Sequence, residues 1–284
     1  MKNQVPVIAQ EQVRAMLRSR PRDSHKGMFG SVAVIGGETG MAGAALLAGR
    51  AALKLGAGAV HVHLLAETAP AVDGGQPELM LHRVDGQVSW PDGSVLAVGC
   101  GMGSSIVARK ILHRVLCGKS TLVLDADALN LLARHSDLRE DLRAREADAI
   151  ITPHPGEAAR LLGVSPADVQ ADRIHSAQLL VEKLRCTVAL KGADTVCASR
   201  NGEICINNTG NPGMSAPGMG DVLTGMIAAF IAQGMDASSA LKLAVHLHGA
   251  AGDALAGEGV AVGMTASDVT EWARWLLNQW MPRS

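Results

Sequence analysis

The chain has 284 residues, of which 48% are hydrophobic, and its formal net charge is −1. This apolar fraction is ample for one large core, and single α/β domains of this length are common. The balanced charge offers no basic surface for DNA, RNA or anionic lipid, and an aromatic content of 2% offers no stacking platform for single-stranded nucleic acid. We therefore expect no nucleic-acid partner.

The cysteines and the N-terminus indicate the compartment. The five cysteines are odd in number and lack Cys-x-x-Cys spacing, which is typical of reduced thiols in a cytosolic protein. The N-terminus is polar and has no signal-peptide stretch, and no apolar run approaches the length that spans a bilayer. These features predict a cytoplasmic protein without a membrane partner.

The predicted elements follow a polar lead-in over residues 1–25, which holds one short helix around Glu11–Arg18. Short β-branched runs then alternate with helical stretches. The expected strands are Ser31–Ile35, Ala59–Leu64, Val95–Val98, Leu122–Leu124, Ala149–Thr152 and Thr187–Leu190. The expected helices between them are Ala42–Leu55, Ser105–Leu116, Ala128–His135, Gly156–Leu162 and Pro166–Leu184.

A small hairpin over Thr195–Ile206, turning at Asn201-Gly202, is expected next. The three helices expected to finish the chain are Asp221–Gln233, Ala237–Leu255 and Ser267–Trp280. Strands that are apolar on both faces and separated by helices predict a largely parallel sheet covered by helices on both faces. No repeat or charged linker divides the sequence, so residues 1–284 are expected to form one domain.

Ligands bind such sheets at the carboxyl ends of the strands, so the loops there form the candidate site. The strongest candidate is the glycine-rich loop NTGNPGMSAPGMGD, Asn208–Asp221. Glycines before a helix let backbone N–H groups surround an anion, and the helix dipole adds to the attraction. Asp221 at the helix start then serves as a base toward a hydroxyl. The alternative is a flexible loop with Asp221 as an ordinary N-cap, but so long a glycine-rich segment favours phosphate.

The motif TPHPGE, Thr152–Glu157, closes a predicted buried strand. Two prolines fix the shape of the loop, so that His154 and Glu157 project from a rigid turn. The alternative is a capping box in which Thr152 or a neighbour pairs with Glu157. These residues alone leave both interpretations open.

The motif LKGADT, Leu190–Thr195, places Lys191 at the end of an apolar strand and before a glycine, which suits a nucleotide phosphate. A solvated lysine at a hairpin start is the alternative, and the motif alone favours it. The motif VLDADALN holds Asp125 and Asp127, which would bind Mg²⁺ through water. Helix capping explains these two carboxylates equally well.

Two further glycine loops, Gly36–Ala44 and Gly99–Gly103, leave room for a second nucleotide-sized ligand. Neither fits G-x-G-x-x-G, and G-x-x-x-x-G-K-[S/T] is absent from the sequence, which disfavours a Rossmann oxidoreductase and a P-loop NTPase. His246 and His248 lie two residues apart on a predicted helix and face different ways, so they are interpreted as core or surface histidines rather than metal ligands.

Together and in this order, the motifs KGMFGSVAVIGG, GMAGAALLAGRAAL, LDADALN, TPHPGE, LKGADT and GNPGM…GMGDVLTG resemble the ADP-dependent (S)-NAD(P)H-hydrate dehydratase family. The resemblance runs from about Lys26 to the C-terminus. It implies a ribokinase-like fold, with a mostly parallel central sheet flanked by helices on both faces. The chain leaves no room for the epimerase domain fused in some members, so a stand-alone dehydratase is expected.

The resemblance also implies residue roles. The implied nucleotide contacts are Lys191, Gly192, Ala193, Asp194, Thr195 and Gly220. The implied contacts to the hydrated dinucleotide are Ala44, Gly103, His154 and Asp221, with Asp221 as the catalytic base. Metal ligands stay unknown, with Asp125, Asp127 and Glu157 as candidates. One departure is Ala216-Pro217, where the family has Ser or Thr followed by Gly, which puts the details of phosphate contact in doubt.

The function that the resemblance implies is ADP- or ATP-dependent dehydration of the S form of hydrated NADH and NADPH, with Mg²⁺. A homotetramer is expected from the Trp-bearing C-terminal helix. One alternative is a small-molecule kinase of the same fold, acting on a thiazole, pyrimidine or sugar alcohol; TPHPGE and LDADALN argue against it. Another is a non-catalytic nucleotide sensor, which would have no need of Asp221.

Overall fold

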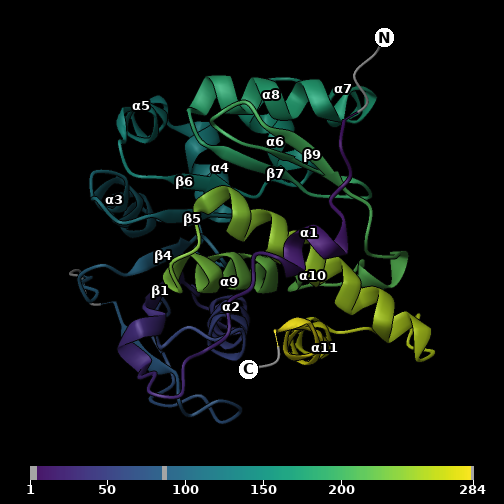
Figure 1. Ribbon diagram of the computed structural model, residues 1–284. Coiled ribbons are helices and arrows are strands. Elements are labelled where there is room, and N and C mark those ends of the chain that lie inside the picture. Colours follow the sequence, from purple (N-terminus) through teal and green to yellow (C-terminus); the bar gives the residue numbers. More distant parts are fainter. Residues whose placement is uncertain (1–4, 85–87, 283–284) are drawn as a thin grey trace.

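The computed structural model describes residues 5–84 and 88–282 (Figure 1). The described strands are β1 Ser31–Gly36, β2 Ala59–Leu64, β3 Met80–Arg83, β4 Val95–Val98, β5 Leu122–Leu124, β6 Ala149–Ile151, β7 Thr187–Leu190, β8 Thr195–Ala198 and β9 Ile204–Asn207. They form one sheet in the order β3-β2-β1-β4-β5-β6-β7-β8-β9. The pairs from β3 to β7 are parallel, while β8 pairs antiparallel with both β7 and β9.

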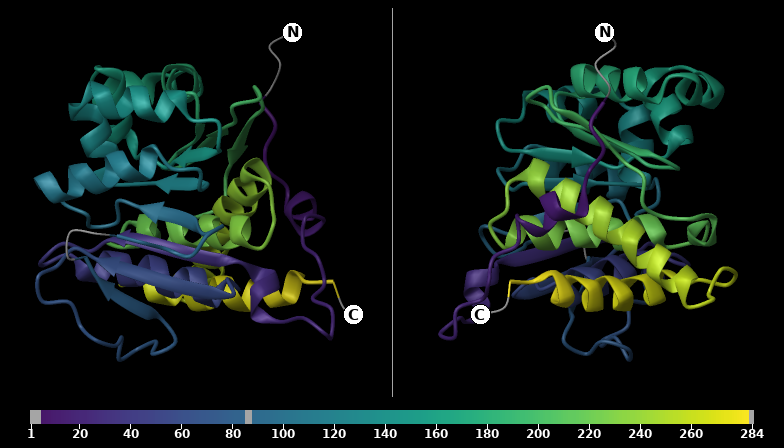
Figure 2. Two further views of the ribbon diagram at one scale, coloured as in Figure 1. Left: turned by 90° about the vertical axis from the view of Figure 1, so that its left-hand side faces the viewer. Right: turned by 45° about the vertical axis from the view of Figure 1, so that its right-hand side comes forward.

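Helices cover both faces of this sheet, as the sequence predicts (Figures 1 and 2). The helices on one face are α1 Gln10–Arg14, α2 Ala42–Lys54, α9 Met219–Ala232, α10 Ala237–Gly257 and α11 Ala266–Trp280. Those on the other face are α3 Ile106–Leu116, α4 Asp127–Arg134, α5 Ser136–Ala144, α6 Pro155–Leu162, α7 Pro166–Ala171 and α8 Arg173–Leu184. Two 3-10 turns, η1 Lys26–Phe29 and η2 Pro212–Met214, lie in the loops.

Two separate cores result from the alternation of side chains along each strand. In β1, Val32 and Val34 enter the core under α2 and α9, whereas Ala33 and Ile35 enter the core under α3 and α4. Both sets are fully buried. Continuous apolar strands are what a sheet with two covered faces requires, and this confirms the predicted three-layer α/β architecture.

The order of the strands reverses beside β1. The chain passes from β1 outward to β2 and β3, and then returns to place β4 on the other side of β1. Such a reversal leaves a crevice between the loops that follow the two central strands. Here these are the two glycine loops, which contact each other where Gly37 N donates to the Cys100 carbonyl at 3.0 Å. By this rule a ligand is expected beside the two loops that the sequence singled out, and we call this expected position the crevice.

The boundaries of two predicted helices are wrong. The segment Pro166–Leu184 is not one helix, because α7 ends at Ala171 and Asp172 separates it from α8. Asp172 has a non-helical backbone, with φ −146° and ψ 85°, and its carboxylate accepts from His175 N at 2.9 Å, which makes it the N-cap of α8. The helix predicted over Glu11–Arg18 spans only Gln10–Arg14.

Two elements were not predicted. Strand β3 is the edge strand, and its Met80, His82 and Arg83 remain exposed, so it shows no apolar run. Helix α5 is strongly charged and buries only Leu138 and Leu142. Both elements lack the apolar periodicity from which the others were recognised.

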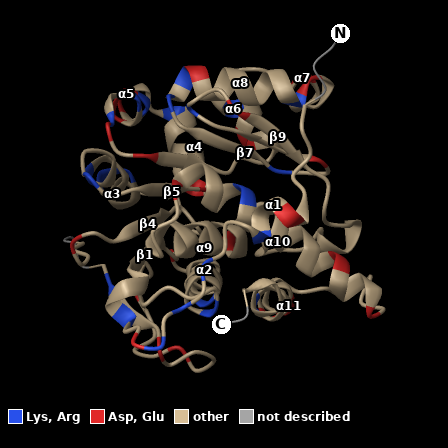
Figure 3. Ribbon diagram, in the orientation of Figure 1, with Lys and Arg blue, Asp and Glu red and all other residues tan. Residues whose placement is uncertain are grey.

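Charged residues of both signs are spread over the two helical layers, as Figure 3 shows. Within the described ranges, no helix combines the length and the apolar character needed to cross a bilayer.

The helices α2 and α9 pack in backbone contact. A Cβ at Gly225 in α9 would lie 2.1 Å from the carbonyl oxygen of Ala48 in α2, closer than a side chain allows. Glycine at this position is therefore a packing requirement, since it lies in an ordinary helical conformation.

We predict that Gly225→Ala lowers the free energy of unfolding by roughly 1–3 kcal/mol, because the added methyl forces the two helices apart. The matched control is Gly257→Ala at the exposed end of α10, where a Cβ would meet nothing within 4 Å. It should raise stability by up to about 1 kcal/mol, the difference in helix propensity. Urea unfolding of both variants checks this, and equal effects would contradict the packing argument.

Candidate active site

A buried carboxylate, Asp125, lies at the centre of the carboxyl edge of the sheet. It follows β5 and is 1% exposed. Its Oδ1 accepts from Lys191 Nζ at 2.6 Å and from Ala126 N at 2.8 Å, and its Oδ2 accepts from Thr224 Oγ1 at 3.0 Å. These bonds join the ends of β5 and β7 to α9, so that three predicted motifs meet at one carboxylate.

Lys191 stays charged in this setting. Burial alone would lower the pKa of its ammonium, but the carboxylates of Asp125 and Glu157 raise the pKa above its usual value. Its side chain is 19% exposed and lines the cavity described below. A Cβ at Gly220 would lie 3.0 Å from Lys191 Nζ and 3.1 Å from Asp125 Oδ2. Glycine thus allows the first turn of α9 to approach the ion pair.

The N-terminus of α9 is open to a ligand. Its N-cap is Gly218, whose φ of 89° suits glycine, and among the described residues no side chain caps this helix end. The first-turn N–H groups have no acceptor within the helix, and the dipole makes this end positive. Asp221 is not the N-cap, as the alternative held, but the third residue of the helix. The geometry is that of an anion site with a carboxylate beside it.

Burial raises the pKa of Asp221 to about 6. The charges of Asp125 and Asp127 act in the same direction, whereas a hydrogen bond from the Cys100 thiol and the charge of Lys191 lower it. A carboxylate whose pKa lies this close to neutrality is suited to accept a proton and release it again.

His154 and Glu157 form a reciprocal capping box at the start of α6. The ring Nδ1 of His154 accepts from Gly156 N at 3.0 Å, and Glu157 Oε2 accepts from His154 N at 2.8 Å. The capping interpretation of TPHPGE is therefore confirmed, with His154 rather than Thr152 as the cap. The His154 side chain is still 52% exposed, so capping does not prevent it from meeting a ligand.

The two side chains differ in their pKa. Burial raises the pKa of Glu157 to about 7, with the Lys191 charge opposing and the Asp125 charge adding to the effect. Burial lowers the pKa of His154, and the charges of Lys191 and Arg160 lower it further. His154 is thus neutral near pH 7, and Glu157 is partly protonated there.

Asp127 fixes one of the glycine loops. Its Oδ2 accepts from Gly103 N at 2.8 Å, and its Oδ1 accepts from Asn130 Nδ2 at 3.2 Å. Ala126, between the two aspartates, has φ 49° and ψ −112°, a conformation that costs a non-glycine residue about 1–3 kcal/mol. The strained turn directs Asp125 toward Lys191 and Asp127 toward Gly103.

The three metal candidates Asp125, Asp127 and Glu157 do not form a metal cage. In the part of the chain that the structure describes, no three ligand atoms that include theirs lie within 4.8 Å of one another. Both oxygens of Asp125 are also occupied by hydrogen bonds. The helix-capping alternative does not hold for Asp125 either, because the N-cap of α4 is Ala126.

A cavity of about 570 Å³ lies between the loop after β7, the loop before α9 and α10. All six residues expected to contact a nucleotide line it: Lys191, Gly192, Ala193, Asp194, Thr195 and Gly220. Ala44 and Gly103 lie elsewhere, at the crevice beside β1, where a Cβ at Gly101 would meet Ala44. Asp221 directly follows Gly220 of the cavity, and the Cys100 thiol of the other glycine loop is close enough to lower its pKa, so Asp221 lies between the two regions.

Two residues that position the site were not predicted. Thr224, which holds Asp125, lies in α9 among apolar residues and is fully buried. Asp253 of α10 accepts from Gly210 N at 2.8 Å and from Asn211 Nδ2 at 3.0 Å, which anchors the glycine-rich loop. A polar side chain within the apolar run of α9 was the available signal for Thr224, whereas α10 carries several polar residues and gave no such signal for Asp253.

We predict that Asp253→Ala weakens nucleotide affinity about tenfold, because the loop loses two charge-assisted hydrogen bonds that order it. Glu258→Ala, at the exposed end of the same helix, is the matched control. Isothermal titration calorimetry with ADP measures both affinities. An unchanged affinity in Asp253→Ala would show that the loop is ordered without this anchor.

We predict that Glu157 makes stability depend on pH. Its pKa of about 7 in the folded state exceeds the ordinary 4.5, so the folded state binds more protons between these values. The free energy of unfolding therefore falls as pH rises from 4.5 to 7, by roughly 3 kcal/mol for the full shift. Glu157→Gln should flatten this fall, as denaturant unfolding at the two pH values would reveal. Equal slopes for variant and parent would refute the assignment.

Comparisons with known proteins agree on one family. The family model described as NAD(P)H-hydrate dehydratase matches residues 32–274. The chain is 42% identical over 268 residues to the ADP-dependent (S)-NAD(P)H-hydrate dehydratase of Neisseria meningitidis, covering 93% of this chain and 90% of that protein. It is also 42% identical to the bifunctional NAD(P)H-hydrate repair enzyme Nnr of Coxiella burnetii, of which it spans 53%.

A solved structure resembles the fold over its full length. The ADP/ATP-dependent NAD(P)H-hydrate dehydratase of Bacillus subtilis, co-crystallised with ATP and Mg²⁺, superposes with a TM-score of 0.86 at 30% identity. The match covers 99% of this chain and 100% of that chain.

Proposed function

The chain belongs to the NAD(P)H-hydrate dehydratase family, and from this membership we propose that it returns hydrated NADH and NADPH to their working forms, with ADP or ATP as the phosphoryl donor. It is a hydro-lyase with a ribokinase-like fold. The observation that carries the proposal is the position of Asp221. It lies at the open N-terminus of α9, between the nucleotide cavity and the crevice.

The damaged cofactor carries a hydroxyl on the ring carbon beside the ring nitrogen. Hydroxide leaves poorly at neutral pH, but a phosphorylated hydroxyl leaves readily as phosphate. The lone pair of the ring nitrogen expels it, and loss of a proton from the neighbouring carbon restores the dihydropyridine. The enzyme therefore has to transfer a phosphoryl group to a hydroxyl and then allow elimination.

The residues of the site supply the parts of this reaction. Asp221 accepts the proton of the hydroxyl as the oxygen attacks the phosphorus. The first-turn N–H groups of α9 surround the transferring phosphoryl group, and Lys191 adds a positive charge beside it. Asp125 positions Lys191 through the 2.6 Å ion pair. The loop over residues 191–195 holds the nucleotide in the cavity.

The hydrated dinucleotide is the second ligand. We assign its binding to the crevice, with contacts from Ala44, Gly103, His154 and Asp221. The exposed ring of neutral His154 supports this role, because a neutral imidazole donates and accepts hydrogen bonds without repelling other cations of the site.

The carboxylates of the site offer few oxygens that could hold Mg²⁺. It prefers oxygen ligands and commonly takes one or two carboxylates together with phosphates and water. Asp125 and Asp127 have both carboxylate oxygens in hydrogen bonds, whereas only Oε2 of Glu157 accepts one, so Glu157 is the candidate carboxylate that has an oxygen left to hold it. Its contribution when bound is to share the negative charge of the phosphates.

The assembly and compartment are part of the same proposal. Helix α11 pairs Trp272 with Trp275 at 5.5 Å between ring centroids, and Trp275 is 53% exposed. An exposed aromatic side chain on a terminal helix supports contact with other copies of the chain, in a homotetramer. We place the enzyme in the cytoplasm, where its nucleotide ligands are used.

We predict that the S form of hydrated NADH regains the near-ultraviolet absorbance of the dihydropyridine when incubated with the protein, Mg²⁺ and ADP or ATP. ADP should serve at least as well as ATP, and excess EDTA should stop the recovery. Nucleotide consumption without recovered absorbance would indicate a small-molecule kinase, and no consumption at all a nucleotide sensor. Full turnover in EDTA would remove Mg²⁺ from the mechanism.

We predict that Asp221→Asn lowers turnover by roughly two to four powers of ten, the usual contribution of a general base. Nucleotide affinity should be kept, since one negative charge near the phosphates is removed. In the parent, activity should decline below pH 6, where Asp221 becomes protonated. The control is Asp137→Asn in the first turn of α5, far from the site. Turnover within a few-fold of the parent would exclude Asp221 as the base.

A further inference from the structure

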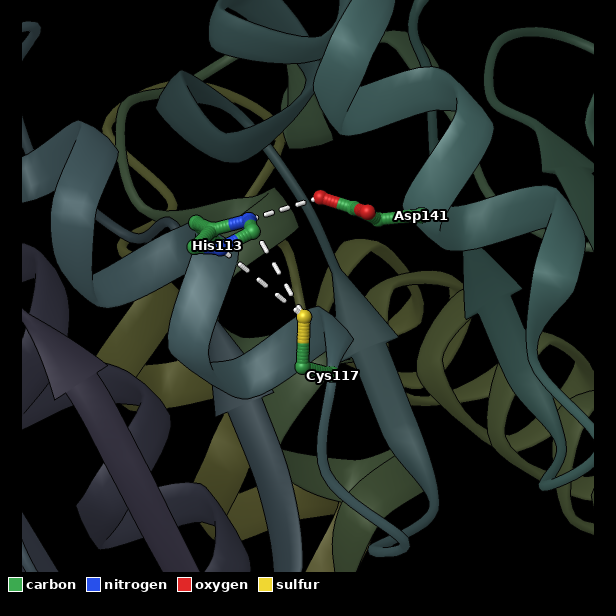
Figure 4. A group of neighbouring side chains, drawn as sticks. All are labelled: His113, Cys117 and Asp141. Atoms are coloured by element: carbon green, nitrogen blue, oxygen red, sulfur yellow. Dashed lines mark hydrogen bonds and ion pairs between the residues drawn. The ribbon is translucent and has the colours of Figure 1, made fainter.

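A second group of reactive side chains lies away from the candidate active site, on the outer face of α3 and α5. His113 and Cys117 belong to the last turn of α3 and its C-cap, and Asp141 belongs to α5 (Figure 4). Helix α3 begins beside the crevice loop, and its 11 residues span roughly 16 Å. The group is therefore separated from the crevice by the length of a helix.

The three side chains lie close together, with the Cys117 thiol near both ring nitrogens of His113. Asp141 Oδ2 lies 2.7 Å from His113 Nδ1, and Cys117 Sγ lies 3.9 Å from the same nitrogen. One ligand atom of each residue lies within 4.8 Å of the other two. Tetrahedral zinc bonds of about 2.0–2.3 Å place ligand atoms roughly 3.3–3.6 Å apart. The observed distances lie on either side of this range, so shifts of less than 1 Å would seat a metal.

The ligands stand on a rigid support. His113 and Cys117 are four residues apart, which places them on one face of the helix. The opposite face of α3 is buried through Ile111, Leu112 and Val115. Leu138 and Leu142 fix α5 in the same core. The distance between the pair His113 and Cys117 on α3 and Asp141 on α5 is thus fixed by the core beneath the two helices.

The local electrostatics favour a divalent cation. A thiolate and a carboxylate would together neutralise its two charges. The guanidinium of Arg145 already occupies the carbonyls of Val115 and Leu116, so backbone oxygens do not compete as ligands. Cys117 is also exposed, whereas the other four cysteines are buried.

We propose that His113, Cys117 and Asp141 form a zinc site that links α3 to α5, with its fourth position open to solvent. Sulfur, imidazole and carboxylate are the ligands that zinc accepts, whereas Mg²⁺ and Ca²⁺ require oxygen throughout. On binding, the thiol proton of Cys117 passes to solvent and the sulfur–zinc bond replaces the S–H bond. The imidazole binds as the neutral form.

The test uses Co²⁺ as a spectroscopic probe for the metal-free full chain. Titration should produce one thiolate-to-cobalt charge-transfer band that saturates at one Co²⁺ per chain, and an equimolar addition of Zn²⁺ should bleach it. Zn²⁺ should also raise the melting temperature in proportion to the logarithm of its concentration, because it binds only the folded form.

Three variants and a matched control assign the ligands. Cys117→Ser should abolish the charge-transfer band, and His113→Ala and Asp141→Asn should each weaken Co²⁺ affinity at least tenfold. Asp137→Asn lies one turn earlier in α5 and removes the partner of Arg109 instead, so it should leave Co²⁺ binding unchanged. Circular dichroism confirms that each variant is folded.

The outcomes are decisive in both directions. The band with one-to-one stoichiometry and its loss in Cys117→Ser support the site. Absence of a band in the folded parent overturns the proposal. A band that survives Cys117→Ser, or equal affinity in Asp141→Asn and Asp137→Asn, overturns it as well. None of these results depends on whether the protein dehydrates hydrated NADH.

Discussion

The ion pair between Lys191 and Asp125 is the interaction on which the active-site arrangement depends. It crosses β6, because it joins the end of β5 to the end of β7, and through Thr224 it also fixes α9. An unpartnered charge buried here would be strongly destabilising, so each group requires the other. The same pair holds Lys191 at the wall of the nucleotide cavity. Gly220 allows the helix end to close over it, and this brings the N–H groups of α9 and the Asp221 carboxylate to one place.

Much of this arrangement could be predicted from the sequence. Continuous apolar strands separated by helices predict a covered parallel sheet, and that sheet brings the loops after its strands to one edge. Glycine spacing before an apolar helix predicts the anion site, and the six motifs in register indicate the family. The structure gathers all six predicted nucleotide contacts around one cavity. These features are encoded locally, in periodicity and in turn residues, so one sequence suffices to find them.

The remaining features depend on contacts between distant segments. Lys191 alone resembles a solvated lysine, and only Asp125, 66 positions earlier, gives it a fixed place. The same holds for Asp253, whose anchoring of the loop is invisible in a helix pattern. Asp221 lies within the first turn of α9 rather than at its cap, because the cap is Gly218, whose φ is 89°. The sequence pattern alone did not show where the helix begins. Edge strand β3 and charged helix α5 bury few apolar side chains, so their sequences show no periodic spacing of apolar residues.

The contact between Ala48 and Gly225 has a consequence for motion. Helices that slide past one another in shear movements need side chains between their backbones to repack. Here the two backbones touch, so α2 and α9 move as one rigid body, and with them move Ala44 and Asp221 at their N-terminal ends. Sliding of α2 past α9 is therefore not the movement that admits a dinucleotide.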